Sequence, residues 1–230
     1  MYAFELVRPK SLADASAALA RSGGKALAGG QSLISTMKLR LAAPGTLVDL
    51  SQLPELKGIR KEGGAITIGA LTTHAQVAES EVVQNALPAL AALAHGIGDR
   101  QVRNMGTIGG SIAHADPAAC YPAAIVGLGA TIQTTKRSIA ADDFFKHMFE
   151  TALDDGEIVV SVTFPIPKKA GYVKFPNPAS RFALVGVFVA QTQTGVRAAV
   201  TGAASCVFRS KELEGALTKS FTPEIGRAHV

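Results

Sequence analysis

Apolar and polar positions alternate along the chain in short segments that predict a mixture of strands and helices. The segments 46–50, 65–70 and 157–167 are rich in Val, Ile and Thr and predict strands. The Ala/Leu-rich segment 85–95 predicts a helix instead. This succession of short elements indicates a mixed α/β or α+β fold.

Capping residues mark further helices. The segments SLAD (11–14) and THAQ (73–76) have the pattern of capping boxes, and the first predicts a helix that runs to about Arg21. The segment 25–28 then predicts a short buried strand. Another helix is predicted to begin near Pro117, because proline suits the first turn of a helix.

The character of the sequence changes after residue 167. The predicted elements beyond it are three strands and a helix, at 171–175, 182–193, 196–204 and 211–219. We therefore place a domain boundary near residues 167–171 and expect a second, α+β domain after it.

The composition supports a folded core and argues against a nucleic-acid partner. Hydrophobic residues make up 47% and charged residues 18% of the 230 positions, so the chain can bury a core. The formal net charge is +5, but Lys and Arg never cluster beyond pairs such as Lys168-Lys169. A nucleic-acid-binding surface concentrates these residues, so we expect none here.

The two cysteines, Cys120 and Cys206, are too few and too far apart for a zinc site, an iron–sulfur site or a disulfide framework. The N-terminus does not resemble a signal peptide. The longest apolar run, 86–94, contains Pro88 and is too short to span a bilayer. We therefore expect a cytoplasmic protein with no membrane span.

Several catalytic motifs are absent from the sequence. The fingerprint G-x-G-x-x-G does not occur, since GLGATI at Gly127 has only its first two glycines. There is no G-x-x-x-x-G-K-[ST] loop and no H-E-x-x-H motif, and the five histidines lack ligand-like spacing. We therefore expect neither a catalytic acid–base group nor a metal site in this chain.

Two glycine-rich stretches remain, KALAGGQSLI (25–34) and GTIGGSIAHADPAACYP (106–122), about eighty residues apart. Consecutive glycines let backbone N–H groups point into one concavity, and such nests bind phosphate. Two converging nests would suit a diphosphate, with Ser32, Thr107 and Ser111 as additional donors. The alternative is that both stretches are tight turns that allow close strand packing.

The segments AGGQSLI and RNMGTIGGSIAHADPAA resemble the two flavin-binding signatures of the FAD subunit of molybdenum hydroxylases. That family includes the medium subunit of carbon monoxide dehydrogenase and the flavin domain of xanthine dehydrogenase. The resemblance implies an α+β fold with a two-lobed FAD-binding domain of the p-cresol methylhydroxylase/vanillyl-alcohol oxidase type. This domain would span residues 1–167, with lobes at about 1–55 and 56–167. A smaller, incomplete α+β flavoprotein domain would follow at 171–224.

The resemblance also implies which residues contact FAD. Backbone amides of residues 28–33 would wrap the diphosphate, residues 107–111 would form the second nest, and His114 would donate to phosphate or ribose oxygens. Val159 would pack near the flavin ring or serve only in the core, and Lys174 would approach the cofactor or lie on the surface. The full set is Ala28, Gly29, Gly30, Gln31, Ser32, Leu33, Ile97, Thr107, Ile108, Gly109, Gly110, Ser111, His114, Val159 and Lys174.

The chain departs from the family pattern at two places. Cys120 stands where the family usually has Asp or Glu, which would help to hold the adenosine half, and a thiol cannot replace that strong acceptor. Asp116, just before it, is interpreted as the cap of the helix at Pro117. The last six residues, IGRAHV (225–230), resemble a translated sequencing-adapter tail, so we expect the natural chain to continue differently.

The resemblance implies an electron-transfer subunit. A small [2Fe–2S] subunit and a large molybdopterin subunit would be its partners, in a dimer of heterotrimers, and NAD or another acceptor would take the electrons. Two alternatives stay open. One is a self-sufficient FAD-dependent oxidase or reductase of the same fold, and the other is a non-catalytic assembly subunit that has lost FAD.

Overall fold

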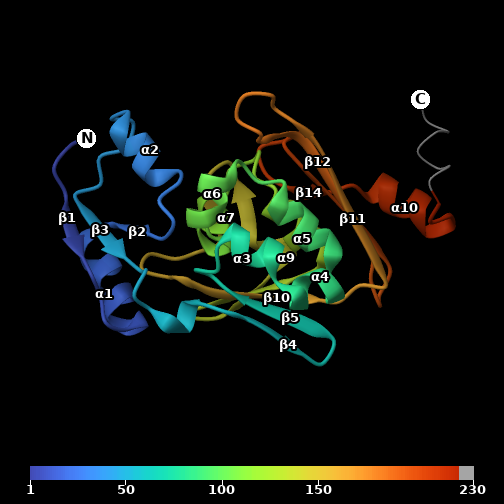
Figure 1. Ribbon diagram of the computed structural model, residues 1–230, viewed down its shortest axis with the longest axis horizontal. Coiled ribbons are helices and arrows are strands. Elements are labelled where there is room, and N and C mark those ends of the chain that lie inside the picture. The colour runs from blue at the N-terminus through green and yellow to red at the C-terminus, as the bar shows by residue number, and fades with distance from the viewer. Residues whose placement is uncertain (223–230) are drawn as a thin grey trace.

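The computed structural model describes residues 1–222, so the suggested tail at 225–230 lies outside the described residues, as do 223 and 224. The N-terminal lobe is a small parallel sheet at one end of the molecule (Figure 1). Its strands pair in the order β1 (Glu5–Val7), β3 (Thr46–Asp49) and β2 (Lys25–Leu27), connected by α1 (Leu12–Ser22) and α2 (Leu33–Lys38).

Local chemistry explains how this lobe is laid out. The Ser11 hydroxyl accepts a hydrogen bond from the Asp14 N–H (3.1 Å), so α1 begins where the sequence predicts. Strand β2 also lies where it was predicted, but Lys25 and Ala26 are exposed. The expectation of a buried strand is therefore wrong, because β2 is an edge strand and β3 occupies the centre of the sheet.

An antiparallel five-stranded sheet forms the second lobe. Its strands run in the order β4 (Ile59–Glu62), β5 (Ala65–Gly69), β10 (Val159–Pro165), β6 (Thr131–Thr134) and β7 (Ser138–Ala140). Short elements lie in the connections, namely η1 (Pro54–Leu56), α9 (Ala141–Phe144), β8 (Phe145–His147) and β9 (Glu150–Thr151). The strands predicted at 65–70 and 157–167 are thus neighbours in one sheet.

Six helices lie between β5 and β6 in the chain and pack beside this sheet (Figure 1). They are α3 (His74–Glu79), α4 (Glu81–Ala86), α5 (Pro88–His95), α6 (Arg100–Met105), α7 (Ile108–His114) and α8 (Tyr121–Leu128). The start of α3 has both hydrogen bonds of the capping box predicted from Thr73 and Gln76. None of the helices within residues 1–222 has the length and apolar character needed to cross a bilayer.

Three local predictions in this region are wrong. The helix expected over 85–95 is two helices, because Leu87 leaves the helical region (φ −148°, ψ 62°) and Pro88 begins a new one. The helix expected near Pro117 begins at Tyr121. Asp116 therefore caps no helix, and its Oδ1 instead accepts a hydrogen bond from the Ala118 N–H (2.8 Å) in a local turn.

The C-terminal part is a four-stranded antiparallel sheet with one helix. Its strands run in the order β11 (Lys169–Pro176), β12 (Ala183–Gln191), β13 (Val196–Thr201) and β14 (Phe208–Arg209), and α10 (Lys211–Lys219) follows. The long β11–β12 hairpin lies at the opposite end from the N-terminal lobe (Figure 1). The predicted boundary at 167–171 thus coincides with the start of a new sheet.

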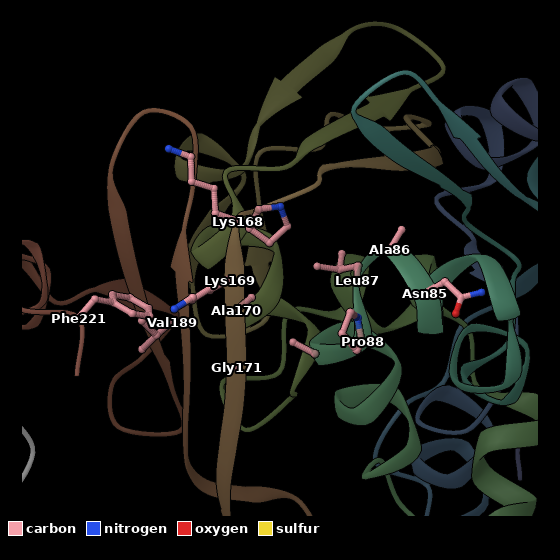
Figure 2. A pocket seen from close by; sticks show the side chains of 12 residues that line it. Asn85, Ala86, Leu87, Pro88, Lys168, Lys169, Ala170, Gly171, Val189 and Phe221 are labelled. Carbon is pink, nitrogen blue, oxygen red and sulfur yellow. The ribbon is translucent and has the colours of Figure 1, made fainter. Parts of the chain in front are cut away.

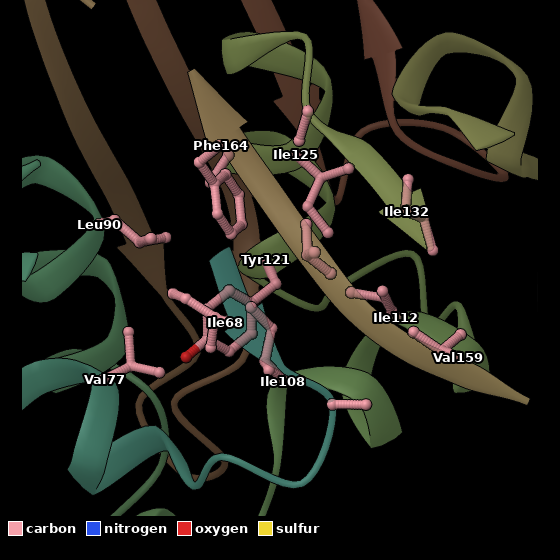
Figure 3. Packing of buried hydrophobic residues seen from close by; sticks show 14 of the residues in the cluster. Ile68, Val77, Leu90, Ile108, Ile112, Tyr121, Ile125, Ile132, Val159 and Phe164 are labelled. Carbon is pink, nitrogen blue, oxygen red and sulfur yellow. The ribbon is translucent and has the colours of Figure 1, made fainter. Parts of the chain in front are cut away.

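One continuous hydrophobic core connects this sheet to the two lobes that precede it. Figure 3 shows its centre, where Tyr121 and Ile125 of α8 lie beside Phe164 of β10. Phe188 of β12 is fully buried in the same core, against α8. A Cβ on Gly127 of α8 would lie 2.9 Å from Phe188 Cδ1, so the missing side chain lets helix and sheet pack closely.

We predict that Phe188→Ala lowers the free energy of unfolding by about 3–5 kcal/mol, because it leaves a cavity in the shared core. Urea unfolding followed by circular dichroism measures this change, and Val173→Ala, at a side chain that is 77% exposed on the neighbouring strand, serves as the control. A single transition is expected for both variants. Two separate transitions in the unmodified chain would contradict the shared core.

Candidate functional site

Two hollows of about 690 Å³ each occur in the described part of the molecule. The first is a groove between the α4–α5 junction and β11, lined by side chains such as Leu87, Pro88 and Lys169 (Figure 2). None of the residues implicated by the sequence lines it. The second is a cleft between the N-terminal lobe and the second lobe, and thirteen of the fifteen implicated residues line it. We therefore take the cleft as the candidate site.

The loop from Ala28 to Ser32 offers unused hydrogen-bond donors to the cleft. Within residues 1–222, the backbone N–H groups of residues 29–32 donate to no protein acceptor. Gly30 has a φ of +69°, which glycine adopts without strain, and this conformation turns the chain into α2. Consecutive free N–H groups make a concavity that suits an anion, as the sequence predicts for this stretch.

Glycine also allows this loop to meet the second stretch directly. A Cβ added to Gly29 would lie 2.0 Å from Met105 O and 2.8 Å from Gly106 Cα, which leaves no room for any side chain. A Cβ on Gly110 would lie 3.6 Å from Ala28 Cβ. The two glycine-rich stretches therefore pack main chain against main chain at the border of the cleft.

The second stretch is not the backbone nest that the sequence suggests. Residues 108–114 form helix α7, and the first N–H groups are already used: Ile108 donates to Thr72 O (3.1 Å) and Gly109 to Ala70 O (2.8 Å). The Gly110 N–H donates to the Thr107 hydroxyl (3.1 Å). The prediction of a second backbone nest at residues 107–111 is therefore wrong. All four of Thr107, Gly109, Gly110 and Ser111 line the cleft, but Thr107 also caps α7 and Gly109 lets it pack against Ala70.

The other implicated residues separate into two groups. Ile97, His114 and Val159 line the cleft, although Val159 is also buried in the core. Ile108 is fully buried and Lys174 is not part of the cleft lining. The prediction that Ile108 contacts FAD is therefore wrong, because its side chain is buried in the core and cannot touch a ligand. The Lys174 ammonium lies at the rim of the cleft, because its Nζ is 3.5 Å from the Sγ of Cys120, which lines the cleft.

His74 is a cleft residue that the sequence reasoning missed. Its ring lies 5.3 Å from that of Tyr121, and within the described residues its Nδ1 is buried without a hydrogen-bond partner. Burial, aided by the charge of Arg103, lowers its pKa to about 4, so the imidazole is neutral at pH 7. The sequence around His74 predicts only the start of a helix, so its position in the cleft becomes visible only in the folded structure.

Phe149 was missed as well. It lies in the β8–β9 turn with a φ of +58°, and its N–H donates to Ala115 O (3.1 Å). Ala115 also has a left-handed backbone conformation (φ +50°). Its ring stands 4.9 Å from His114, and both rings line the cleft. A bulky residue with positive φ is uncommon, and here a tertiary hydrogen bond holds it beside the cleft.

Glu157 is a buried carboxylate at the cleft wall. It accepts hydrogen bonds from Thr134 Oγ1 (2.6 Å), Arg137 Nη2 (3.1 Å) and the Asp154 N–H (2.8 Å). Burial alone would raise its pKa, but these hydrogen bonds and the charge of Arg137 outweigh burial and hold the pKa below its ordinary value of 4.5. Glu157 is therefore ionised at pH 7 and is committed to structure.

Comparison with known proteins decides the family. The profile described as "FAD binding domain in molybdopterin dehydrogenase" matches residues 2–167. The chain belongs to this family. Its cofactor is FAD, and it is an FAD-dependent oxidoreductase subunit, as the glycine-rich segments predict.

Relatives of this flavoprotein match almost its whole length. It is 37% identical to the carbon monoxide dehydrogenase medium chain of Hydrogenophaga pseudoflava, over 98% of this chain and 84% of that one. It is 36% identical to the glyceraldehyde dehydrogenase medium chain of Sulfolobus acidocaldarius, over 92% and 79%. A crystal structure of the Hydrogenophaga pseudoflava enzyme superposes with a TM-score of 0.92 at 38% identity, over 99% and 84%. The predicted α+β fold is confirmed.

The cleft of this flavoprotein fits an extended dinucleotide. The free N–H groups of residues 29–32 match the anionic diphosphate, and the missing side chains of Gly29, Gly30 and Gly110 let the loops that border the cleft pack closely. A Cβ at Gly29 would have to displace main-chain atoms. A volume of about 690 Å³ lies in the range of cofactor pockets.

We predict that Gly29→Ala raises the dissociation constant for FAD about tenfold or more, which corresponds to at least about 1.4 kcal/mol. The added Cβ would overlap Met105 O and push the donor loop away from the C-terminal end of α6. Titration of FAD into the purified chain, followed by flavin fluorescence, measures the constant. Gly64→Ala is the matched control, since nothing lies within 4 Å of its Cβ, and an unchanged constant for Gly29→Ala would contradict the prediction.

The lowered pKa of Glu157 predicts an acid-sensitive contribution to stability. A carboxylate with a depressed pKa in the folded state stabilises the protein above its ordinary value of 4.5, and this contribution is lost as the pH falls through the folded value. Glu157→Gln should therefore be less stable than the unmodified chain at pH 7, with a difference that shrinks below about pH 4.5.

Urea unfolding between pH 3 and pH 7 measures this difference. Glu62→Gln is the control, because the Glu62 side chain is 80% exposed and its ion pair with Arg60 is a surface contact (3.7 Å). A difference for Glu157→Gln that stays constant over the whole pH range would show that the carboxylate charge does not stabilise the fold.

Proposed function

We propose that this chain, an FAD-binding medium-type subunit of the molybdenum hydroxylase family, passes electrons from an iron–sulfur partner to NAD or another acceptor. The convergence of the free donors of residues 29–32 with α7 across one cleft carries the proposal. Bound FAD supplies the one- and two-electron redox chemistry, and the protein supplies binding, orientation and electrostatics.

The partners in this proposal are a small [2Fe–2S] subunit and a large molybdopterin subunit, arranged as a dimer of heterotrimers. Two relatives are named as medium chains of dehydrogenases, and another, 34% identical, is named as subunit alpha of the 6-hydroxypseudooxynicotine dehydrogenase complex of Paenarthrobacter nicotinovorans. These names describe one chain among several. They support a partner that oxidises the organic substrate and delivers the electrons.

The residues of the cleft have distinct roles in this proposal. The N–H groups of residues 29–32 hold the diphosphate, and the Ser111 hydroxyl borders the same part of the cleft. Ile97, Leu153 and Val159 give the cleft apolar walls that exclude water from a ring system. Ionised Glu157 and neutral His74 have pKa values far from 7, which makes both poorly suited to proton transfer at neutral pH.

We predict that FAD bound to the isolated chain is not reduced by an organic substrate of the complex, whereas FAD in the complex with both partner subunits is. The absorbance of the flavin under anaerobic conditions measures this. Reduction by the same small molecule without partners would support a self-sufficient oxidase or reductase. Failure of the purified chain to bind FAD would instead support a subunit that has lost the cofactor.

A further inference from the structure

The ammonium group of Lys174 lies at the rim of the cleft, where its hydrogen-bond acceptors carry no charge. Its Nζ donates to Gly96 O (2.6 Å) and Arg181 O (2.9 Å), and lies 3.5 Å from Cys120 Sγ. Cys120 and Arg181 line the cleft. Three elements thus fix this charge at the cleft wall, namely the end of α5, the start of α8 and the loop between β11 and β12.

The charge of Lys174 has no carboxylate partner. Within residues 1–222, no carboxylate oxygen lies within 4.0 Å of its Nζ, whereas Arg137 and Arg197, for example, each pair with an Asp or Glu. Asp99, which follows Gly98 in the turn after α5, uses Oδ1 to accept a hydrogen bond from the Val102 N–H (2.8 Å).

Two further cations reinforce the positive charge of this turn. Arg103 Nη1 donates to Ile97 O (3.0 Å) and to Gly98 O (3.2 Å), and Arg181 Nη1 lies 3.5 Å from Gly98 O. Neither guanidinium lies within 4.0 Å of a carboxylate oxygen among the described residues. Among residues 1–222 these three cations donate only to carbonyl oxygens and one thiol, so this rim of the cleft favours negative charge on whatever binds beside it.

We propose, building on the function proposed above, that Lys174 raises the reduction potential of the bound flavin and that the thiol of Cys120 leaves this charge uncompensated. Two-electron reduction with uptake of one proton leaves the isoalloxazine ring one unit more negative. An ammonium group without a counter-ion stabilises that form more than the oxidised one. A carboxylate at position 120, which the family resemblance leads one to expect, would neutralise the ammonium.

In this proposal Lys174 and Cys120 lie beside the isoalloxazine, whereas the family resemblance assigns position 120 to the adenosine half. Ile97 and Phe182, which is 45% exposed, line the same cleft and offer apolar surface to a ring system. Adenosine does not change its charge on reduction, so an unpaired cation beside it could not shift the potential. This difference makes the two placements distinguishable by experiment.

The experiment compares Cys120→Asp with Cys120→Asn in the full 230-residue chain, because the two side chains have nearly the same shape and differ in charge. We expect Cys120→Asp to weaken the binding of reduced FAD about tenfold relative to oxidised FAD, a potential lower by about 30 mV. Dye-equilibrated reductive titration gives the potential, and flavin fluorescence gives the affinity of the oxidised form.

Lys174→Met tests the same charge without altering the buried thiol. It should lower the potential in the same direction, whereas Lys174→Arg should retain it. Lys169→Met, on the same strand but in the groove of Figure 2, is the matched control and should leave the potential unchanged.

Equal weakening of oxidised and reduced FAD by Cys120→Asp and Lys174→Met would overturn the inference and place the pair beside the adenosine half. Unchanged potentials in both variants would overturn it as well. Both results leave the proposed function intact, because the unmodified chain still binds FAD. Failure of the unmodified chain to bind FAD would overturn the proposed function and this inference together.

Discussion

The cleft depends on one contact between bare stretches of main chain. Gly29 packs against Met105 and Gly106 so closely that a Cβ would lie 2.0 Å from a carbonyl oxygen. This contact brings the N-terminal lobe to within reach of α7, and no acceptor among residues 1–222 takes up the N–H groups of residues 29–32. These four residues are half-buried or exposed at the cleft, so their N–H groups stay available to an anionic ligand.

Around this contact, each part of the fold contributes a different wall. The N-terminal lobe supplies donors, the second lobe supplies a rigid helix and apolar side chains, and the loop between β11 and β12 supplies Arg181 and Phe182. The shared core fixes the positions of these walls relative to one another, because α8 packs against both β10 and the C-terminal sheet. A cofactor whose potential depends on nearby charges needs such fixed surroundings.

The sequence predicts the elements better than their limits. The capping residues at 11–14 and 73–76 and the β-branched runs at 65–70 and 157–167 determine local structure through short-range hydrogen bonds and side-chain shape, and these predictions are confirmed. The break at Leu87 and the exposure of β2 depend on neighbours that are distant along the chain. Local patterns carry no information about such neighbours.

By itself, the sequence carried the two glycine-rich stretches and the resemblance that implied the family and its cofactor, because both depend only on the local order of residues. Only the tertiary structure decided which donors stay free. Thr72 and Ala70 accept from the first two N–H groups of α7, whereas no acceptor in the described part of the chain takes up those of residues 29–32. The fold also brought Lys174 to Cys120 across 54 positions. Burial and partnership are properties of the packed chain, so the chemistry of the site is fixed only there.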